Sequence, residues 1–110
     1  MTTETDNNAI VVLSNLPDKE SAEKLAEYLI QNKLAACVNI LAPCQSCYEW
    51  QGKIEHCTEY PMVIKSTQKK YAALESAILE IHPYELPEVI QVRIEAGHAP
   101  YLAWINQTLL

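Results

Sequence analysis

The stretch "CQSCYEWQGKIEHCTEYPMVIKST", residues 44–67, decides the fold because it carries the signals of a long β-hairpin. Gln51-Gly52 predicts a tight turn, since glycine at the second turn position tolerates a positive φ. Pro61 has no N–H to donate, so we expect a bulge or a sheet edge there. Side chains after the turn alternate between two sides of a strand. One side carries Ile54, His56, Thr58, Tyr60, Met62 and Ile64, and the other carries Lys53, Glu55, Cys57, Glu59, Val63 and Lys65.

The arm before the turn is equally long. An apolar run, residues 34–43, leads into it and is extended by "CQSCYEW". At about 12 residues an arm, the hairpin would reach roughly 40 Å. The two main helices expected below span only about 21 Å each. The hairpin must therefore overhang them, and its far end carries the apolar residues Tyr48, Trp50 and Ile54. Because an exposed apolar strand pair favours association, we predict self-association.

The segments around the hairpin complete a known arrangement. Apolar runs predict strands at residues 9–13 and 88–95, and 3.6-residue periodicity predicts helices at 19–32 and 68–81. Asp18 and Thr67 are the expected caps of these helices. Pro100 suits the start of a last helix, with Leu102, Ile105 and Leu109 on one face.

The predicted order is β-α-β-β-α-β followed by a helix. It indicates an α+β, ferredoxin-like split βαβ fold, with an antiparallel sheet and a long central hairpin. Right-handed crossovers place both main helices on one face of the sheet. We expect one domain over residues 9–110, preceded by a disordered tail at residues 1–8.

Charge and composition exclude several classes of function. The formal net charge is −6, with 8 Lys and Arg against 14 Asp and Glu, so we expect no nucleic-acid binding. No apolar run reaches the roughly 20 residues of a membrane span, so no membrane association is expected. The start "MTTETDNN" has no signal-peptide pattern, which predicts a cytoplasmic protein. The four cysteines should then remain thiols.

A rigid turn follows the second helix in "EIHPYELPEVIQVRI", residues 80–94. Pro83 and Pro87 fix it, and His82, Tyr84 and Glu88 lie within it. One interpretation is purely structural, because prolines end a helix and a carboxylate at a strand start is usually solvated. The other interpretation is a metal site, since imidazole and carboxylate groups are common ligands for transition metals.

The remaining reactive residues give weaker signals. Cys44 and Cys47 form a C-x-x-C pair, but an extended strand puts them on opposite faces, so only a turn after Pro43 would bring them together. Cys37 and Cys57 are expected to be small buried hydrophobic residues. His56 and His98 are expected at the surface, and Trp104 in packing contacts. Ser14 has no G-x-S-x-G context, so we predict no catalytic residues and no enzyme.

Five blocks resemble one family over nearly the whole chain: "KLAACVNI" (33–40), "YEWQGKIE" (48–55), "MVIKST" (62–67), "HPYELPEV" (82–89) and "YLAWI" (101–105). In order and spacing they are similar to the CutA divalent cation tolerance proteins. The resemblance implies a ferredoxin-like subunit in a tight homotrimer, with an architecture like that of the PII signalling proteins. It implies a role linked to copper and other divalent cations, and no enzymatic activity.

The resemblance also implies site residues. His82 and Glu88 match the family's metal-binding region. Residues that match those lining the clefts between subunits are Trp50, Glu59, Lys65 and Tyr84. The alternative function is a PII-like signalling or scaffold trimer that holds a small metabolite or a protein in these clefts, with Lys65 binding an anionic ligand and Tyr84 stacking on it. A packing role for Trp50 and an ion pair between Glu59 and Lys65 are the structural alternatives.

The chain departs from the family pattern at two positions. Some bacterial members carry a cysteine at the end of the first strand and a second histidine before the one that matches His82. This chain has Ser14 and Ile81 there. A hydroxyl is a poor ligand for soft metals and isoleucine is none, so the departures put a copper site of the family type in doubt.

Overall fold

A computed structural model gives the structure of the chain and describes residues 8–110. Its elements, in chain order, are β1 (Ala9–Leu16), α1 (Lys19–Gln31), β2 (Cys37–Ile40), β3 (Cys44–Trp50), β4 (Lys53–Thr67), η2 (Gln68–Lys70), α2 (Tyr71–Ile81), β5 (Ile90–Arg93) and α3 (Ala99–Thr108). The predicted tail lies outside the described residues except for Asn8, whose carbonyl accepts a hydrogen bond from the Gln68 N–H at 2.8 Å.

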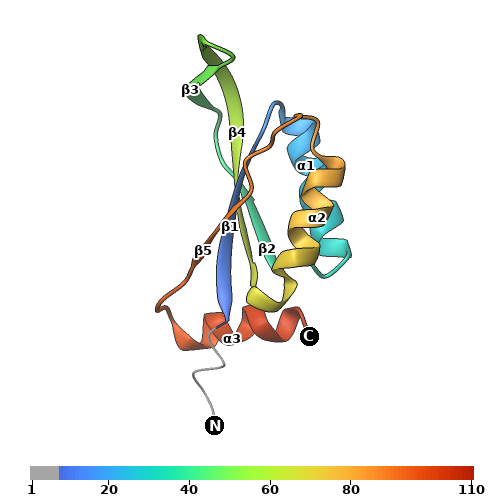
Figure 1. The fold of residues 1–110 in the computed structure, drawn as a ribbon. Helices are drawn as coiled ribbons and strands as arrows, with labels where there is room; N and C mark the ends of the chain where they lie inside the picture. The colour runs from blue at the N-terminus through green and yellow to red at the C-terminus, as the bar shows by residue number, and fades with distance from the viewer. Residues whose placement is uncertain (1–7) are drawn as a thin grey trace.

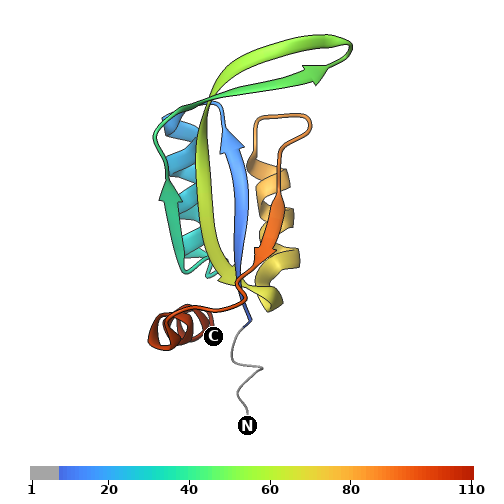
Figure 2. The same ribbon diagram turned by 90° about the vertical axis from the view of Figure 1, so that its left-hand side faces the viewer.

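The sheet confirms the predicted α+β, ferredoxin-like architecture. Its order is β2-β4-β1-β5, and β3 extends it by pairing with β4. All the pairings are antiparallel. Helices α1 and α2 cover one face of the sheet, and α3 crosses its lower end (Figure 1). The paired β3 and β4 project beyond the two helices, as Figure 2 shows.

The hairpin turn has the predicted geometry. Gln51 and Gly52 both have positive φ, 54° and 82°, and Trp50 pairs with Lys53, which describes a two-residue turn of the type that matches strand twist. The predicted continuous first arm is instead two strands. Between the β3 and β2 pairings, residues 41–43 stand opposite only Tyr60 and Pro61. The irregularity expected at Pro61 thus lies on the opposite arm, while β4 itself continues through the proline.

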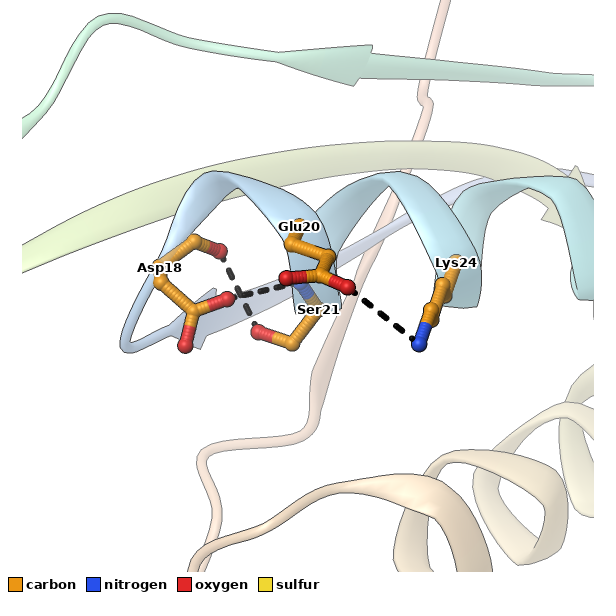
Figure 3. Close-up of polar contacts among 4 residues, drawn as sticks. All are labelled: Asp18, Glu20, Ser21 and Lys24. Carbon is orange, nitrogen blue, oxygen red and sulfur yellow. Dashed lines mark hydrogen bonds and ion pairs between the residues drawn. The ribbon is translucent and has the colours of Figure 1, made fainter.

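The helix caps were predicted with mixed success. Asp18 caps α1, because its Oδ1 accepts from the Ser21 N–H at 2.7 Å, and its carbonyl accepts from the Ser21 hydroxyl at 3.1 Å (Figure 3). Glu20 and Lys24 add an exposed pair at 3.4 Å that contributes little. The expectation for Thr67 is wrong, since its side chain makes no capping hydrogen bond.

The main core lies between the sheet and the two helices. Its fully buried side chains include Val12, Leu25, Ile64, Leu74 and Ile78. A smaller cluster joins α3 to the end of the sheet through Ala9, Ile105 and Leu109, with Leu102 packed against it. This confirms the predicted apolar face of the last helix. No helix in residues 8–110 is long and apolar enough to cross a membrane.

The sheet face opposite α1 and α2 is apolar, and within residues 8–110 only α3 covers it, at one end (Figure 2). Side chains directly across a strand pair share a face, and neighbours along a strand alternate. Register therefore places five apolar residues together on this side, which we call the open face: Val11, Leu13, Val63, Ile90 and Val92. Ile90 and Val92 are exposed, and the other members are only half-buried. An apolar face of this kind is typical of an interaction surface.

Candidate functional site

The turn after α2 is held to the end of β1 by His82. The His82 side chain is 6% exposed. The Tyr84 N–H donates to His82 Nδ1 at 3.1 Å, so the ring proton is on Nε2, which donates to the Asn15 carbonyl at 2.7 Å. The loop between α2 and β5 consequently runs past the tip of β1 (Figure 1). His82 is thus a buried residue with both ring nitrogens engaged.

The second predicted metal ligand meets the same residue of β1. Glu88 Oε1 accepts from the Asn15 side-chain amide at 3.1 Å. Asn15 therefore connects His82 and Glu88, which sequence reasoning placed in one site without identifying this link. Next to Asn15, the Ser14 hydroxyl is 1% exposed and has no hydrogen-bond partner in the described part of the chain. Ile81 is exposed and offers no ligand atom.

A buried acid and a phenol lie beside the turn. The Tyr84 hydroxyl donates to Glu59 Oε2 at 2.9 Å, and Glu59 is 6% exposed. The Tyr84 ring also lies 4.8 Å from the His82 ring, centroid to centroid. Burial, and then the hydrogen bond to Glu59, raise the pKa of Tyr84 well above its usual value of 10.0. The pair is thus polar, partly desolvated and fixed in orientation by the turn.

We expect the raised pKa of Tyr84 to appear in the alkaline stability of the protein. Above pH 10, Tyr84 of the unfolded chain loses its proton, whereas Tyr84 of the folded chain keeps it. The contribution of Tyr84 to the free energy of unfolding is therefore complete below pH 10 and falls as the pH rises. The Tyr84→Phe variant lacks this contribution. Urea unfolding between pH 9 and pH 11 should show a steeper decline for wild type than for Tyr84→Phe. Parallel declines would contradict the assignment.

Lys65 and Trp50 lie far from Tyr84 within one chain. Lys65 Nζ is 5.6 Å from the centroid of the Tyr101 ring, near α3. Glu59 and Lys65 are six residues apart on β4, which separates them by roughly 20 Å. Trp50 lies at the hairpin tip. The expected pairing of Lys65 with Tyr84 around one ligand, and the ion pair of Lys65 with Glu59, therefore do not form within a single subunit.

The cysteines remain separate thiols. Cys44 and Cys47 lie on opposite faces of β3, as the extended-strand argument predicted. Cys37 and Cys57 are half-buried, not fully buried as expected. His98 is exposed, as expected. Trp104 is partly exposed but stacks on Tyr101 at 5.6 Å between ring centroids.

One contact escaped the sequence analysis. Cys47 Sγ lies 3.9 Å from His56 Nε2, directly across the hairpin, although His56 was expected only to be a surface residue. The two-residue turn at Gln51-Gly52 fixes this register, so the signal was present in the sequence. Within residues 8–110, no three His, Cys, Asp or Glu side chains are grouped so that they could hold a metal ion.

Comparisons with known proteins agree with the fold and the blocks of sequence. A family model described as the CutA1 divalent ion tolerance protein matches residues 10–108. The divalent-cation tolerance protein CutA of Pectobacterium atrosepticum is 38% identical over 102 residues, which cover 93% of each chain. The CutA protein of Yersinia pestis, strain Pestoides F, is 41% identical over 94% of this chain and 87% of its own length.

Solved structures extend the likeness to the backbone. The crystal structure of CutA from Xylella fastidiosa has a TM-score of 0.90 and 39% identity, over 93% of this chain and 98% of the other. A structure described as the periplasmic divalent cation tolerance protein CutA from Archaeoglobus fulgidus has a TM-score of 0.90 and 36% identity, over 93% and 99% of the two chains. Sequence blocks, fold and relatives agree, and this chain belongs to the CutA1 family of divalent ion tolerance proteins.

Proposed function

We propose that this chain acts in divalent cation tolerance as a homotrimer that binds a divalent metal ion. The observation that supports a homotrimer is the open face, an apolar sheet surface. It leads into a hairpin on which Tyr48, Trp50 and Ile54 are exposed. Burying such surface is the main driving force of stable association. Three copies would cover each other's open faces and the side of the projecting hairpin that carries Tyr48 and Trp50.

The metal ion binds at the turn that follows α2, through His82 and Glu88. Metal-bound histidines usually donate the second ring N–H to a carbonyl or carboxylate, which orients the ring. His82 already has this orientation, because Nε2–H donates to the Asn15 carbonyl. Its Nδ1 lone pair accepts from the Tyr84 N–H at 3.1 Å, and the metal would replace this donor. Glu88 supplies the carboxylate, and this ligand pair suits Cu(II) or Zn(II) better than Cu(I).

Calorimetric titration with Cu(II) and Zn(II) tests this site. In Glu88→Gln the amide oxygen can still accept from Asn15, but the negative charge is lost, so we expect affinity to fall about tenfold or more, which is about 1.4 kcal/mol. Glu85→Gln is the matched control, because Glu85 is an exposed acid in the same turn. Equal affinities for wild type and Glu88→Gln would remove Glu88 from the site.

A PII-like ligand trimer is the second candidate. It is favoured by the hydrogen bond of 2.9 Å between the Tyr84 hydroxyl and the buried Glu59 carboxylate. Neither ion pair found in residues 8–110 includes Glu59. In a trimer, Lys65 or Trp50 of a neighbouring copy could complete a cleft around it. A thermal-shift screen of metals against anionic metabolites separates the candidates, because only a cleft ligand would stabilise the protein without metal.

The cellular location stays a prediction. The cytoplasm is expected from the sequence, whereas the Archaeoglobus fulgidus relative is described as periplasmic.

A further inference from the structure

A cysteine and a histidine face each other on the projecting hairpin, away from the turn that holds His82. Cys47 of β3 and His56 of β4 are direct cross-strand partners, and Cys47 Sγ lies 3.9 Å from His56 Nε2. Both side chains are exposed. The neighbouring pair on the same face, Gln45 and Thr58, is joined by a hydrogen bond of 3.2 Å, which supports the register around them. The two ligand atoms are therefore set by the backbone pairing.

The separation of these atoms suits a shared metal ion. With metal–sulfur and metal–nitrogen bonds of about 2.3 and 2.0–2.1 Å, the observed 3.9 Å corresponds to a sulfur–metal–nitrogen angle of about 130°. This angle lies between trigonal and linear coordination. An ion could therefore bind without movement of the backbone.

The surrounding thiols do not compete for Cys47. Cys44 belongs to the opposite face of β3, and Cys57, one residue from His56, belongs to the opposite face of β4. The Cys57 thiol instead lies 3.7 Å from the Tyr48 hydroxyl. Cys47 consequently faces an imidazole and no second thiol, an arrangement suited to binding a metal and unsuited to forming a disulfide within the hairpin.

We propose that Cys47 and His56 form a second metal site, separate from the turn of His82 and Glu88, and that its ion is Cu(I). Thiolate is the ligand that selects Cu(I), imidazole is compatible with copper, and Cu(I) tolerates low coordination numbers. No third His, Cys, Asp or Glu within residues 8–110 completes the group, so water or a small external thiol takes the open position. The Cys47 thiol releases its proton to solvent as the sulfur–copper bond forms, so apparent affinity rises with pH.

Anaerobic competition with a chromophoric Cu(I) chelator tests the site on the full chain. Wild type should bind one equivalent of Cu(I) per chain in competition with the chelator. Cys47→Ser should not bind this equivalent. His56→Ala should weaken binding about tenfold or more, which is about 1.4 kcal/mol. The matched control is Cys44→Ser, which removes an exposed cysteine from the other face of the same strand and should bind as wild type does.

The outcomes also separate this site from the one at the turn. Glu88→Gln should leave Cu(I) binding unchanged even if it abolishes Cu(II) binding. Circular dichroism of each variant shows whether the hairpin variants remain folded, and exposed positions such as these are expected to tolerate substitution. Equal loss of Cu(I) in Cys44→Ser and Cys47→Ser, or no loss in Cys47→Ser, would overturn the proposal. Binding of Zn(II) by the pair without Cu(I) would overturn the choice of ion.

Discussion

Replacing His82 by alanine is expected to lower the free energy of unfolding by about 3 kcal/mol. The substitution removes two hydrogen bonds and leaves the Asn15 carbonyl and the Tyr84 N–H without their partner. Each unsatisfied buried polar group costs about 1–3 kcal/mol, and a cavity adds to this because the ring is only 6% exposed. Urea unfolding of both proteins at one chain concentration measures the difference, since association would otherwise shift apparent stability.

His98→Ala is the control for this prediction. His98 precedes α3, is exposed, and makes no side-chain capping hydrogen bond, so its loss should cost less than about 0.5 kcal/mol. The His82→Gln variant should recover part of the loss, because the glutamine amide can reach the place of imidazole Nε2 and donate to Asn15. If His82→Ala were no more damaging than His98→Ala, the turn would not be anchored through this ring.

The local features of this fold were predictable because their signals are local. The turn at Gln51-Gly52, the cap at Asp18 and the apolar faces of α1 and α3 each follow from residues within a few positions of one another. The split between β2 and β3 was not predicted, although Pro43 lies in the gap between them and has no N–H to donate to a strand pairing. What interrupts pairing there is one extra residue opposite Tyr60 and Pro61.

The sequence predicted which residues form the candidate site but not how their side chains are arranged. Asn15 had no motif to mark it, and its bond to His82 spans 67 positions, so only the tertiary structure reveals it. Lys65 and Tyr84 lie in two different family blocks, and in one subunit six residues of β4 separate Lys65 from Glu59, the hydrogen-bond partner of Tyr84. By contrast, the Cys47–His56 contact follows from hairpin register alone and could have been derived from the turn type.

The open face also required the topology, because which side of a strand is covered depends on where the helices pack. Once α1 and α2 are placed on the side of Val12 and Ile64, the residues that alternate with them must face the other way. These residues are apolar as well, so the sheet has two apolar faces and the subunit covers one of them. Because an exposed apolar surface favours association, the open face leads us to expect that this chain associates.

Substituting Val92 by lysine should therefore dissociate the assembly. Val92 is the cross-strand partner of Val11 on the open face and is 51% exposed in the single chain, so an isolated subunit should tolerate the lysine. In a trimer the same lysine would be buried without a partner in each copy, at a cost of several kcal/mol per contact. Light scattering after gel filtration, at micromolar concentration, should give three times the chain mass of 12.4 kDa for wild type and the chain mass for Val92→Lys.

The matched control is Leu79→Lys, because Leu79 is also 51% exposed but lies on α2, on the covered side of the sheet. The change in charge and the loss of apolar surface are similar, so only position distinguishes the two variants. Leu79→Lys should keep the mass of wild type. A wild-type mass equal to that of one chain would refute the trimer, and an unchanged mass in Val92→Lys would show that the subunits associate through another surface. Either result would also remove the inter-subunit cleft around Glu59 and Tyr84, because that cleft exists only if neighbouring copies close over the open face.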